Sequence, residues 1–265
     1  MKIAKYNVWY PKIEVRAEQL IETINSIDAD IIGLQEVPPA FYEKLTTIAK
    51  YPYRAYAPYK DKYVDDEGLG LAILSKYPIN GHFSLAESAD HDNSIAHNAI
   101  IEAKGIRISV TNVHLPWDSA LAKEKQIVAI DKYIHVQKDD AHFFVLLGDF
   151  NTTMEASVHR YLLGDQTLLG CESNPYWNDL ACAHAALNGY EAAPTLDFVN
   201  NPRWGGKNTN YVPDVCDRIY IMESFNWDNE FKLRDVAVFG KEVSPATGYA
   251  PSDHYGVLGE VDFFV

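Results

Sequence analysis

The chain has 265 residues and a mass of 29.9 kDa, which suits one large domain or two small ones. Hydrophobic residues make up 47% of it, as in ordinary soluble proteins, and no apolar run approaches the roughly 18 residues that would cross a bilayer. The formal net charge of −14 argues against tight non-specific DNA binding, although a local basic patch or a bound metal could still accept a nucleic acid.

Apolar strand patterns and helical patterns alternate along the first half of the chain. We expect, in order, a strand over 2–8, a helix over about 14–27, a strand over 31–36, a helix over 41–49, and strands over 69–75, 98–102 and 107–114. A helix over about 120–135 and an apolar strand from Val145 that breaks at Gly148 follow. The tyrosine-rich run 51–59 we interpret mainly as packing residues, with stacking on bases or lipid headgroups as the alternative.

After Ser173 the chain is rich in Asn, Pro, Trp and Gly, and we expect shorter strands over 217–221, 233–239 and 255–265. Leading βα units and a strand-rich second half predict one α/β domain over residues 1–265, with two sheets and helices outside them. The N-terminus resembles a strand more than a signal peptide, and the three cysteines have no C-x-x-C spacing. We therefore expect a cytoplasmic protein with free thiols.

Polar side chains recur where these apolar segments end. They are Asn7, Glu36, His114, Asp149 with Asn151, Asp217, which opens a strand, and the pair Asp253-His254, which precedes the last strand. In layered α/β proteins this edge of the sheet usually holds the ligand. Carboxylates with amide and histidine but no cysteine suit a hard cation such as Mg²⁺ or Mn²⁺, and the histidines suggest phosphoryl chemistry.

Each residue of this set also has a structural interpretation. Asp149 and Asn151 could form an Asx turn, Glu36 could be a loop carboxylate, Asn7 could cap a turn, His114 could be a buried and satisfied histidine, 252–254 could cap a helix, and Asp217 could pair with a lysine or arginine at the rim. The coincidence of all of them in one chain is less probable than any one of them alone.

In this order, the segments around these residues resemble the endonuclease/exonuclease/phosphatase superfamily, which includes deoxyribonuclease I. The matching segments are Asn7, Leu34-Gln35-Glu36-Val37, Asn112-Val113-His114-Leu115, Gly148-Asp149-Phe150-Asn151, Asp217-Arg218-Ile219 and Ser252-Asp253-His254. The resemblance implies a four-layer α/β/β/α sandwich of two packed mixed sheets. It also implies that Glu36 binds an essential Mg²⁺ or Mn²⁺, with Asn7 close by as a metal or phosphate contact and Asp253 as a metal position in some members.

The resemblance implies roles for the remaining residues as well. Asp149 would orient or deprotonate the attacking water, and Asn151 would hold the water or a phosphate oxygen. His254 would contact the scissile phosphate, and Asp217 would orient its ring. His114 matches a second histidine that nucleases and sphingomyelinases of the group keep.

We therefore expect a Mg²⁺-dependent hydrolase of phosphoester bonds, a phosphodiesterase that uses metal-assisted in-line attack by water. The substrate stays open: nucleic-acid ends are one candidate, and a sphingomyelin-like or inositol-phosphate-like phosphoester is the alternative. The segment 195–202 loosely resembles a loop of the tyrosyl-DNA phosphodiesterase branch. A non-catalytic binding protein on this fold would be expected to lack Glu36, Asp149 or His254, and all three are present. We expect a monomer.

Overall fold

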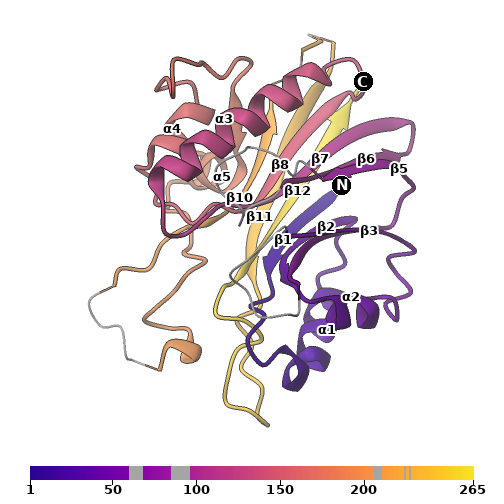
Figure 1. Ribbon diagram of the computed structural model, residues 1–265, viewed down its shortest axis with the longest axis vertical. Coiled ribbons are helices and arrows are strands. Elements are labelled where there is room, and N and C mark those ends of the chain that lie inside the picture. The colour runs from indigo at the N-terminus through magenta and orange to yellow at the C-terminus, as the bar shows by residue number, and fades with distance from the viewer. Residues whose placement is uncertain (60–67, 85–95, 206–210, 224, 227) are drawn as a thin grey trace.

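Two mixed β-sheets pack face to face in the computed structural model, which describes residues 1–59, 68–84, 96–205, 211–223, 225–226 and 228–265 (Figure 1). Within these residues each sheet has six strands. The first sheet has the order β11-β12-β1-β2-β4-β3 and contains β1 (Lys2–Asn7), β2 (Ile31–Val37), β3 (Tyr53–Pro58), β4 (Gly70–Ser75), β11 (Glu230–Phe239) and β12 (Gly256–Phe264). The second has the order β5-β6-β7-β8-β10-β9 and contains β5 (Ile79–Ser84), β6 (Ala96–Ala103), β7 (Ile106–His114), β8 (Phe143–Asp149), β9 (Trp177–Asp179) and β10 (Asp217–Met222).

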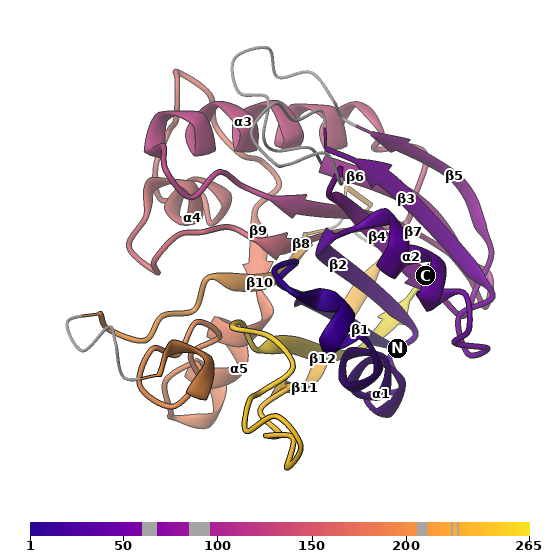
Figure 2. The ribbon, with the colours of Figure 1, turned by 60° about the horizontal axis from the view of Figure 1, so that its bottom comes forward.

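Helices cover the outer faces of both sheets, as Figures 1 and 2 show. The helices α1 (Ala17–Ser26) and α2 (Pro39–Leu45) lie against the first sheet, and α3 (Ala120–Val136) and α4 (Ser157–Leu162) lie against the second. The helix α5 (Leu180–Asn188) contacts β9, β10 and β11, and two short 3₁₀ helices span Ile13–Val15 and Pro202–Trp204. No helix in the described part of the chain is long and apolar enough to span a membrane.

Three apolar layers separate these four layers of secondary structure. Because side chains alternate along a strand, each buried strand supplies two of the apolar layers. In β8, Val145 and Leu147 pack between the sheets, whereas Phe144 and Leu146 pack under α3 and α4. In β1, Ile3 faces the second sheet and Ala4 faces the helices. The four-layer α/β/β/α sandwich is thus confirmed.

Several predicted elements differ from the observed ones. The strands after Ser173 are not all short: β11 begins at Glu230 instead of Leu233 and has 10 residues, whereas β12, with 9 residues, lies within the predicted range 255–265. The register of β11 shifts between Leu233 and Asp235, so a bulge interrupts the alternation that marks a strand in the sequence. The run 51–59 contains β3, and α4, α5, β5 and β9 were not expected. Cys171, Cys182 and Cys216 are free, as predicted.

Candidate active site

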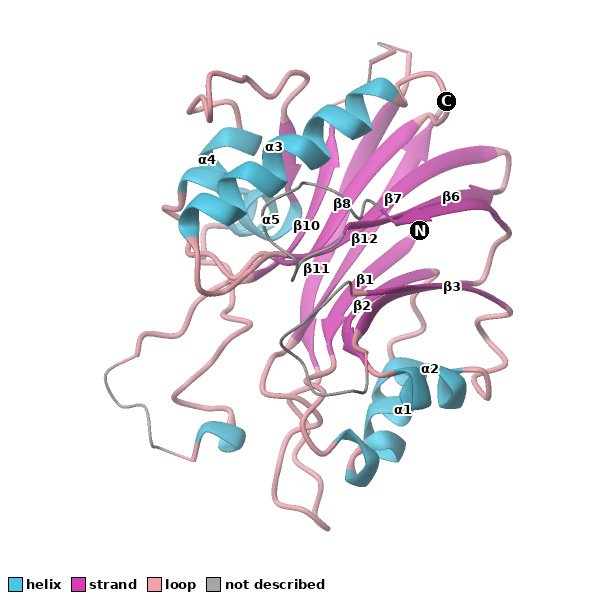
Figure 3. Ribbon diagram, viewed as in Figure 1, coloured by secondary structure: helices cyan, strands magenta, loops and turns pink. Residues whose placement is uncertain are grey.

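Three site residues lie side by side across the second sheet. His114 is the register partner of Asp149 in the parallel pair β7–β8, and Asp149 is the partner of Asp217 in the antiparallel pair β8–β10. Asn7 ends β1 in the first sheet and is the partner of Gln35 in β2. The predicted edge of the sheets therefore does collect these side chains, and the loops after β1, α5 and β11 gather at the same end of the molecule (Figure 3).

The strand alternation aims these side chains at one another. Asp149 follows Val145 and Leu147 on the face of β8 that packs between the sheets, and Asp217 precedes Ile219 on the same face of β10. Asn7 follows Ile3 on the opposing face of β1. The site is thus the polar end of the apolar layer between the two sheets.

Unusual backbone conformations re-aim two of the side chains. Glu36 has φ 57° and lies in a register shift between β2 and β4, and Asn151 has φ 48°. Non-glycine residues rarely adopt this left-handed region, and such residues cluster at functional sites. Gly148 has φ 151°, and a Cβ atom there would lie 2.0 Å from the carbonyl oxygen of Val113. Only glycine fits where β8 ends beside β7.

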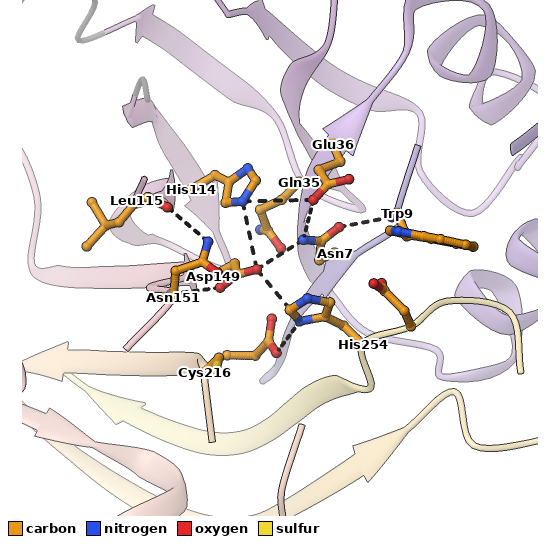
Figure 4. A network of polar contacts seen from close by, with 12 residues as sticks. Asn7, Trp9, Gln35, Glu36, His114, Leu115, Asp149, Asn151, Cys216 and His254 are labelled. Carbon is orange, nitrogen blue, oxygen red and sulfur yellow. Dashed lines mark hydrogen bonds and ion pairs between the residues drawn. The ribbon is translucent and has the colours of Figure 1, made fainter. Parts of the chain in front are cut away.

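Asn7 connects the two central carboxylates. Its Nδ2 donates to Glu36 Oε1 and to Asp149 Oδ2, each at 3.0 Å, and its Oδ1 accepts the backbone N–H of Trp9 at 2.9 Å (Figure 4). The donor on Oδ1 fixes the direction of the amide, so the nitrogen faces the carboxylates. Asn7 lies beside Glu36, as expected, and it holds Glu36 and Asp149 at a fixed spacing.

Asp149 is buried and held through both oxygens. Its Oδ1 accepts the backbone N–H of Asn151 at 2.8 Å, so the Asx turn is present together with the clustered site. Burial alone would raise the pKa of Asp149, but the neighbouring His254, His114 and Lys5 and the bond from Asn7 lower it to about 2. The group is therefore an ionised carboxylate at neutral pH.

Asn151 is fixed by its neighbours. Its Nδ2 donates to the carbonyl of Leu115 at 2.9 Å, and its own carbonyl accepts Lys123 Nζ at 2.5 Å. Among the residues that the structure describes, neither the side-chain Oδ1 nor the second N–H of this amide has a hydrogen-bond partner.

His254 lies between two carboxylates. Its Nδ1 is 2.9 Å from Asp217 Oδ2 and 3.6 Å from Asp149 Oδ2, so the expected contact between Asp217 and His254 is confirmed. The turn before β12 is pinned by Ser252, whose hydroxyl donates to the carbonyl of Asn7 at 2.7 Å and accepts the N–H of His254 at 3.2 Å. The interpretation of 252–254 as a helix cap is wrong, because β12 follows the turn.

Asp217 also pairs with a lysine, so the two interpretations of this residue hold together. Its Oδ1 contacts Lys5 Nζ, and both side chains are 0% exposed, so the partner lies inside the protein and not at the rim. Burial lowers the pKa of Lys5, against the attraction of nearby acidic groups. The ammonium compensates one of the buried negative charges.

His114 faces the same carboxylates from the other side. Its Nε2 lies 3.9 Å from Glu36 Oε1 and 3.8 Å from Asp149 Oδ2, and its Nδ1 is 2.9 Å from the hydroxyl of Tyr59. His114 and His254 thus flank Asp149, and Figure 4 shows both rings directed toward it.

The donor set fits a hard divalent cation. Burial raises the pKa of Asp253 to about 6. The attraction of His254 lowers this pKa, and the repulsion of Glu36 and Asp149 raises it further. Within the described part of the chain, only histidines lie within ion-pair distance of Glu36 and Asp149. A cation held by oxygen ligands would relieve this repulsion, and oxygen ligands suit Mg²⁺ or Mn²⁺.

A second cluster, His159 with Asp179 and Cys182, has ligand atoms close enough to hold an ion. Arg218 donates to Asp179 Oδ2 at 2.7 Å and is fully buried beside the cluster. Because the guanidinium already supplies the positive charge, we assign no metal to this cluster.

Several residues that shape the site were not recognised from the sequence. Lys5 and Tyr59 touch site residues directly. Asn201 donates to the carbonyls of Ser252 and Asp253 at 3.0 Å each. Arg16 donates to carbonyls of both the loop after β1 and the loop before β12, namely those of Val8, Trp9, Pro11 and Pro251. For Asn201 a signal existed, because it lies in the segment 195–202 that resembles a loop of one branch of the superfamily.

The sequence also matches known proteins. A sequence model of the Endonuclease/Exonuclease/phosphatase family matches residues 6–254. A probable CCR4-Not complex 3′-5′-exoribonuclease subunit Ccr4 from Vairimorpha ceranae is 27% identical over 188 residues, which are 58% of this chain but only 40% of that protein.

Solved structures share the fold at low sequence identity. TDP2 of D. rerio complexed with single strand DNA product aligns with a TM-score of 0.78 at 19% identity, over 99% of this chain and 98% of that one. A mannosyl-6-phosphatase of Bacteroides thetaiotaomicron aligns with a TM-score of 0.74 at 17% identity, over 99% of this chain and 100% of that one. At these identities the likeness concerns the fold alone.

Proposed function

Because this chain belongs to the Endonuclease/Exonuclease/phosphatase family of hydrolases, we propose that it is a Mg²⁺- or Mn²⁺-dependent phosphodiesterase. The observation that carries the proposal is the ionised carboxylate of Asp149, held between His114 and His254 beside Glu36. An anionic phosphodiester repels hydroxide, so its hydrolysis needs charge neutralisation and an oriented water. This arrangement can supply both.

Glu36 and Asp253 are the residues that would hold the cation, with Asn7 orienting Glu36 through its Nδ2. When bound there, a divalent cation would neutralise phosphate charge and polarise the P–O bond. The carboxylate Oε2 of Glu36 also accepts the backbone N–H of Tyr10 at 3.2 Å, which fixes its orientation further.

Asp149 accepts a hydrogen bond from the attacking water and aligns it with the phosphorus atom. With a pKa of about 2 it orients the water more effectively than it holds the water's proton. His254, held through Nδ1 by Asp217, presents Nε2 to a phosphoryl oxygen and stabilises its developing charge. Asn151 keeps one amide N–H for the same purpose.

The balance of charge supports a phosphodiester as the substrate class. The positive charge of Lys5 is paired with Asp217, and the ammonium of Lys123 donates to the backbone carbonyl of Asn151, so neither lysine is directed at a substrate phosphate. A phosphodiester with a single negative charge matches the described residues better than a monoester with two. The protein as a whole carries a net charge of −14, which favours a short or terminal phosphodiester over a long polyanion. Nucleic-acid ends are the natural candidate, given the relatives that act on nucleic acids.

The test compares a simple diester, bis(p-nitrophenyl) phosphate, with p-nitrophenyl phosphate, and then single-stranded DNA, duplex DNA, 5′-tyrosyl DNA ends, sphingomyelin and phosphoinositides. We expect hydrolysis of diesters with Mg²⁺ or Mn²⁺ and its loss on chelation. Faster hydrolysis of the monoester would refute the proposed substrate class, and equal rates in the presence of a chelator would refute the metal dependence.

A further inference from the structure

The hydroxyl of Tyr59 connects two parts of the site. It accepts the backbone N–H of Glu36 at 3.1 Å and lies 2.9 Å from His114 Nδ1. Tyr59 follows directly after β3, and its ring is buried. The Tyr59 side chain therefore contacts both the backbone of Glu36 and the ring of His114.

Counting donors and acceptors assigns the proton on the imidazole. A phenol has one hydrogen to donate, and the N–H of Glu36 already donates to its oxygen. Among the described residues, His114 Nδ1 is the one acceptor within hydrogen-bond distance of this hydroxyl. If Nδ1 carried the proton, the phenolic hydrogen would stay unpaired in a buried position, at a cost of about 1–3 kcal/mol. Tyr59 therefore donates to Nδ1, and the ring proton of neutral His114 sits on Nε2.

The proton on Nε2 points into the centre of the site. Glu36 Oε1 at 3.9 Å and Asp149 Oδ2 at 3.8 Å are both too far to accept a direct hydrogen bond. In Figure 4 the ring lies above Asp149 and to the left of Glu36, with one ring nitrogen facing both carboxylates. An oxygen atom placed in that gap would be the acceptor that the structure leaves open.

We propose that Tyr59 is a positioning residue that holds His114 as the neutral Nε2–H tautomer, so that His114 donates a hydrogen bond to a phosphoryl oxygen. The inference rests on the proposed phosphodiesterase function for the identity of that oxygen. It assigns His114 the role of a fixed donor, in contrast to a general acid or base that changes its protonation during the reaction.

The same hydroxyl also sets a spacing. By accepting the N–H of Glu36, Tyr59 supports the left-handed backbone conformation at φ 57° that aims the Glu36 carboxylate at the site. The Tyr59 hydroxyl oxygen thus fixes both the His114 ring and the backbone that carries the Glu36 carboxylate. A fixed donor is worth most in catalysis when it needs no reorganisation during the reaction.

The first test reads the tautomer directly by ¹⁵N NMR of the histidine rings, at about pH 8.5, two units above the ordinary histidine pKa of about 6.5. Tyr56→Phe is the matched control, because Tyr56 lies in β3 and its hydroxyl lies within hydrogen-bond distance of the carbonyls of Val37 and Gly68, which it reaches at 2.9 and 3.2 Å, and not of His114. We expect wild-type His114 to be protonated at Nε2, with Nδ1 showing the shift of a hydrogen-bonded acceptor.

In Tyr59→Phe, the Nδ1 resonance should move to the value of a nitrogen without a hydrogen bond, and in Tyr56→Phe it should stay in place. A proton on Nδ1 in the wild type, or an Nδ1 resonance unmoved by Tyr59→Phe, would overturn the inference. This readout needs neither metal nor substrate, so it stands even if the proposed function fails.

A double-mutant cycle tests the link to catalysis. Tyr59→Phe should lower kcat for a phosphodiester about tenfold with little change in KM, as expected for one oriented hydrogen bond lost in the transition state. In a His114→Ala background the same change should cost clearly less than tenfold, and the loss that remains measures the support that the hydroxyl gives to Glu36. An equal, tenfold loss in both backgrounds would show that Tyr59 does not act through His114. A wild type that hydrolyses no phosphodiester would instead refute the proposed function.

Discussion

The buried pair of Lys5 and Asp217 gives the sharpest prediction about stability. Both side chains are 0% exposed, and the two oxygens of Asp217 are divided between Lys5 and His254. Lys5→Met keeps the length and the apolar stem of the side chain but removes the ammonium. Asp217 would then be a buried carboxylate with only the histidine as a partner.

The magnitude follows from what each change leaves behind. Removing one partner of a buried ion pair costs about 3–5 kcal/mol, because the other charge stays in a medium of low dielectric constant without compensation. Lys5→Met should therefore lower the free energy of unfolding by that amount, and Asp217→Asn should have a similar effect. The double variant leaves neither charge, so its loss should be smaller than the sum of the single losses by about 3 kcal/mol.

Urea unfolding of the wild type and the three variants measures these differences, provided that the slopes of the transitions agree. A loss below about 1 kcal/mol for Lys5→Met would refute the reasoning, because the ammonium would then not be compensating Asp217. Additive losses in the double variant would equally show that the two residues act independently.

Three further outcomes follow from the structure. Glu36→Gln should weaken Mg²⁺ binding in calorimetry at least about tenfold while the unfolding midpoint is kept, and an unchanged affinity would remove Glu36 as a ligand. Burial, together with the neighbouring His82, lowers the pKa of His97 from 6.5 to about 4. The free energy of unfolding should therefore fall by up to about 3 kcal/mol as the pH drops from about 6.5 to about 4, because the unfolded chain binds the proton first. A His97→Gln variant that loses as much stability over the same pH range would contradict this assignment. Gly148→Ala should destabilise the protein by at least about 3 kcal/mol, because the new Cβ would meet the carbonyl of Val113 at φ 151°, and an unchanged Tm would show that the strands can separate there.

The layered fold could be predicted because the residues of the buried strands are apolar on both faces, which indicates apolar layers on both sides of a sheet. Strand β8 is apolar on both faces up to Gly148, as a strand between two apolar layers must be. Helix α5 was missed although its ends carry signals: Asp179 caps Cys182 N at 2.9 Å, and Gly189 ends the helix at φ 74°. Its short, alanine-rich sequence gives too weak a periodicity to stand out.

The site could be predicted only as far as strand ends define it. His114, Asp149 and Asp217 end or begin strands, so their position at one edge follows from the alternation of the chain. The side chains that contact these residues, Lys5 and Tyr59, could not be predicted in this way. Lys5 lies 212 positions from Asp217, and a lysine inside an alternating strand ordinarily faces water. Tyr59 lies 55 positions from His114, in the tyrosine-rich run 51–59, whose composition indicates residues that pack in the core.

Hydrolysis of a phosphodiester in ¹⁸O-labelled water tests the central claim most directly, because that claim is attack on phosphorus by a water that Asp149 orients. With Mg²⁺ present, the account predicts label in the phosphate group of the product and none in the released alcohol. It also predicts that Asp149→Asn slows this incorporation by about a hundredfold or more. Label in the alcohol, or full incorporation at the wild-type rate in Asp149→Asn, would contradict the account.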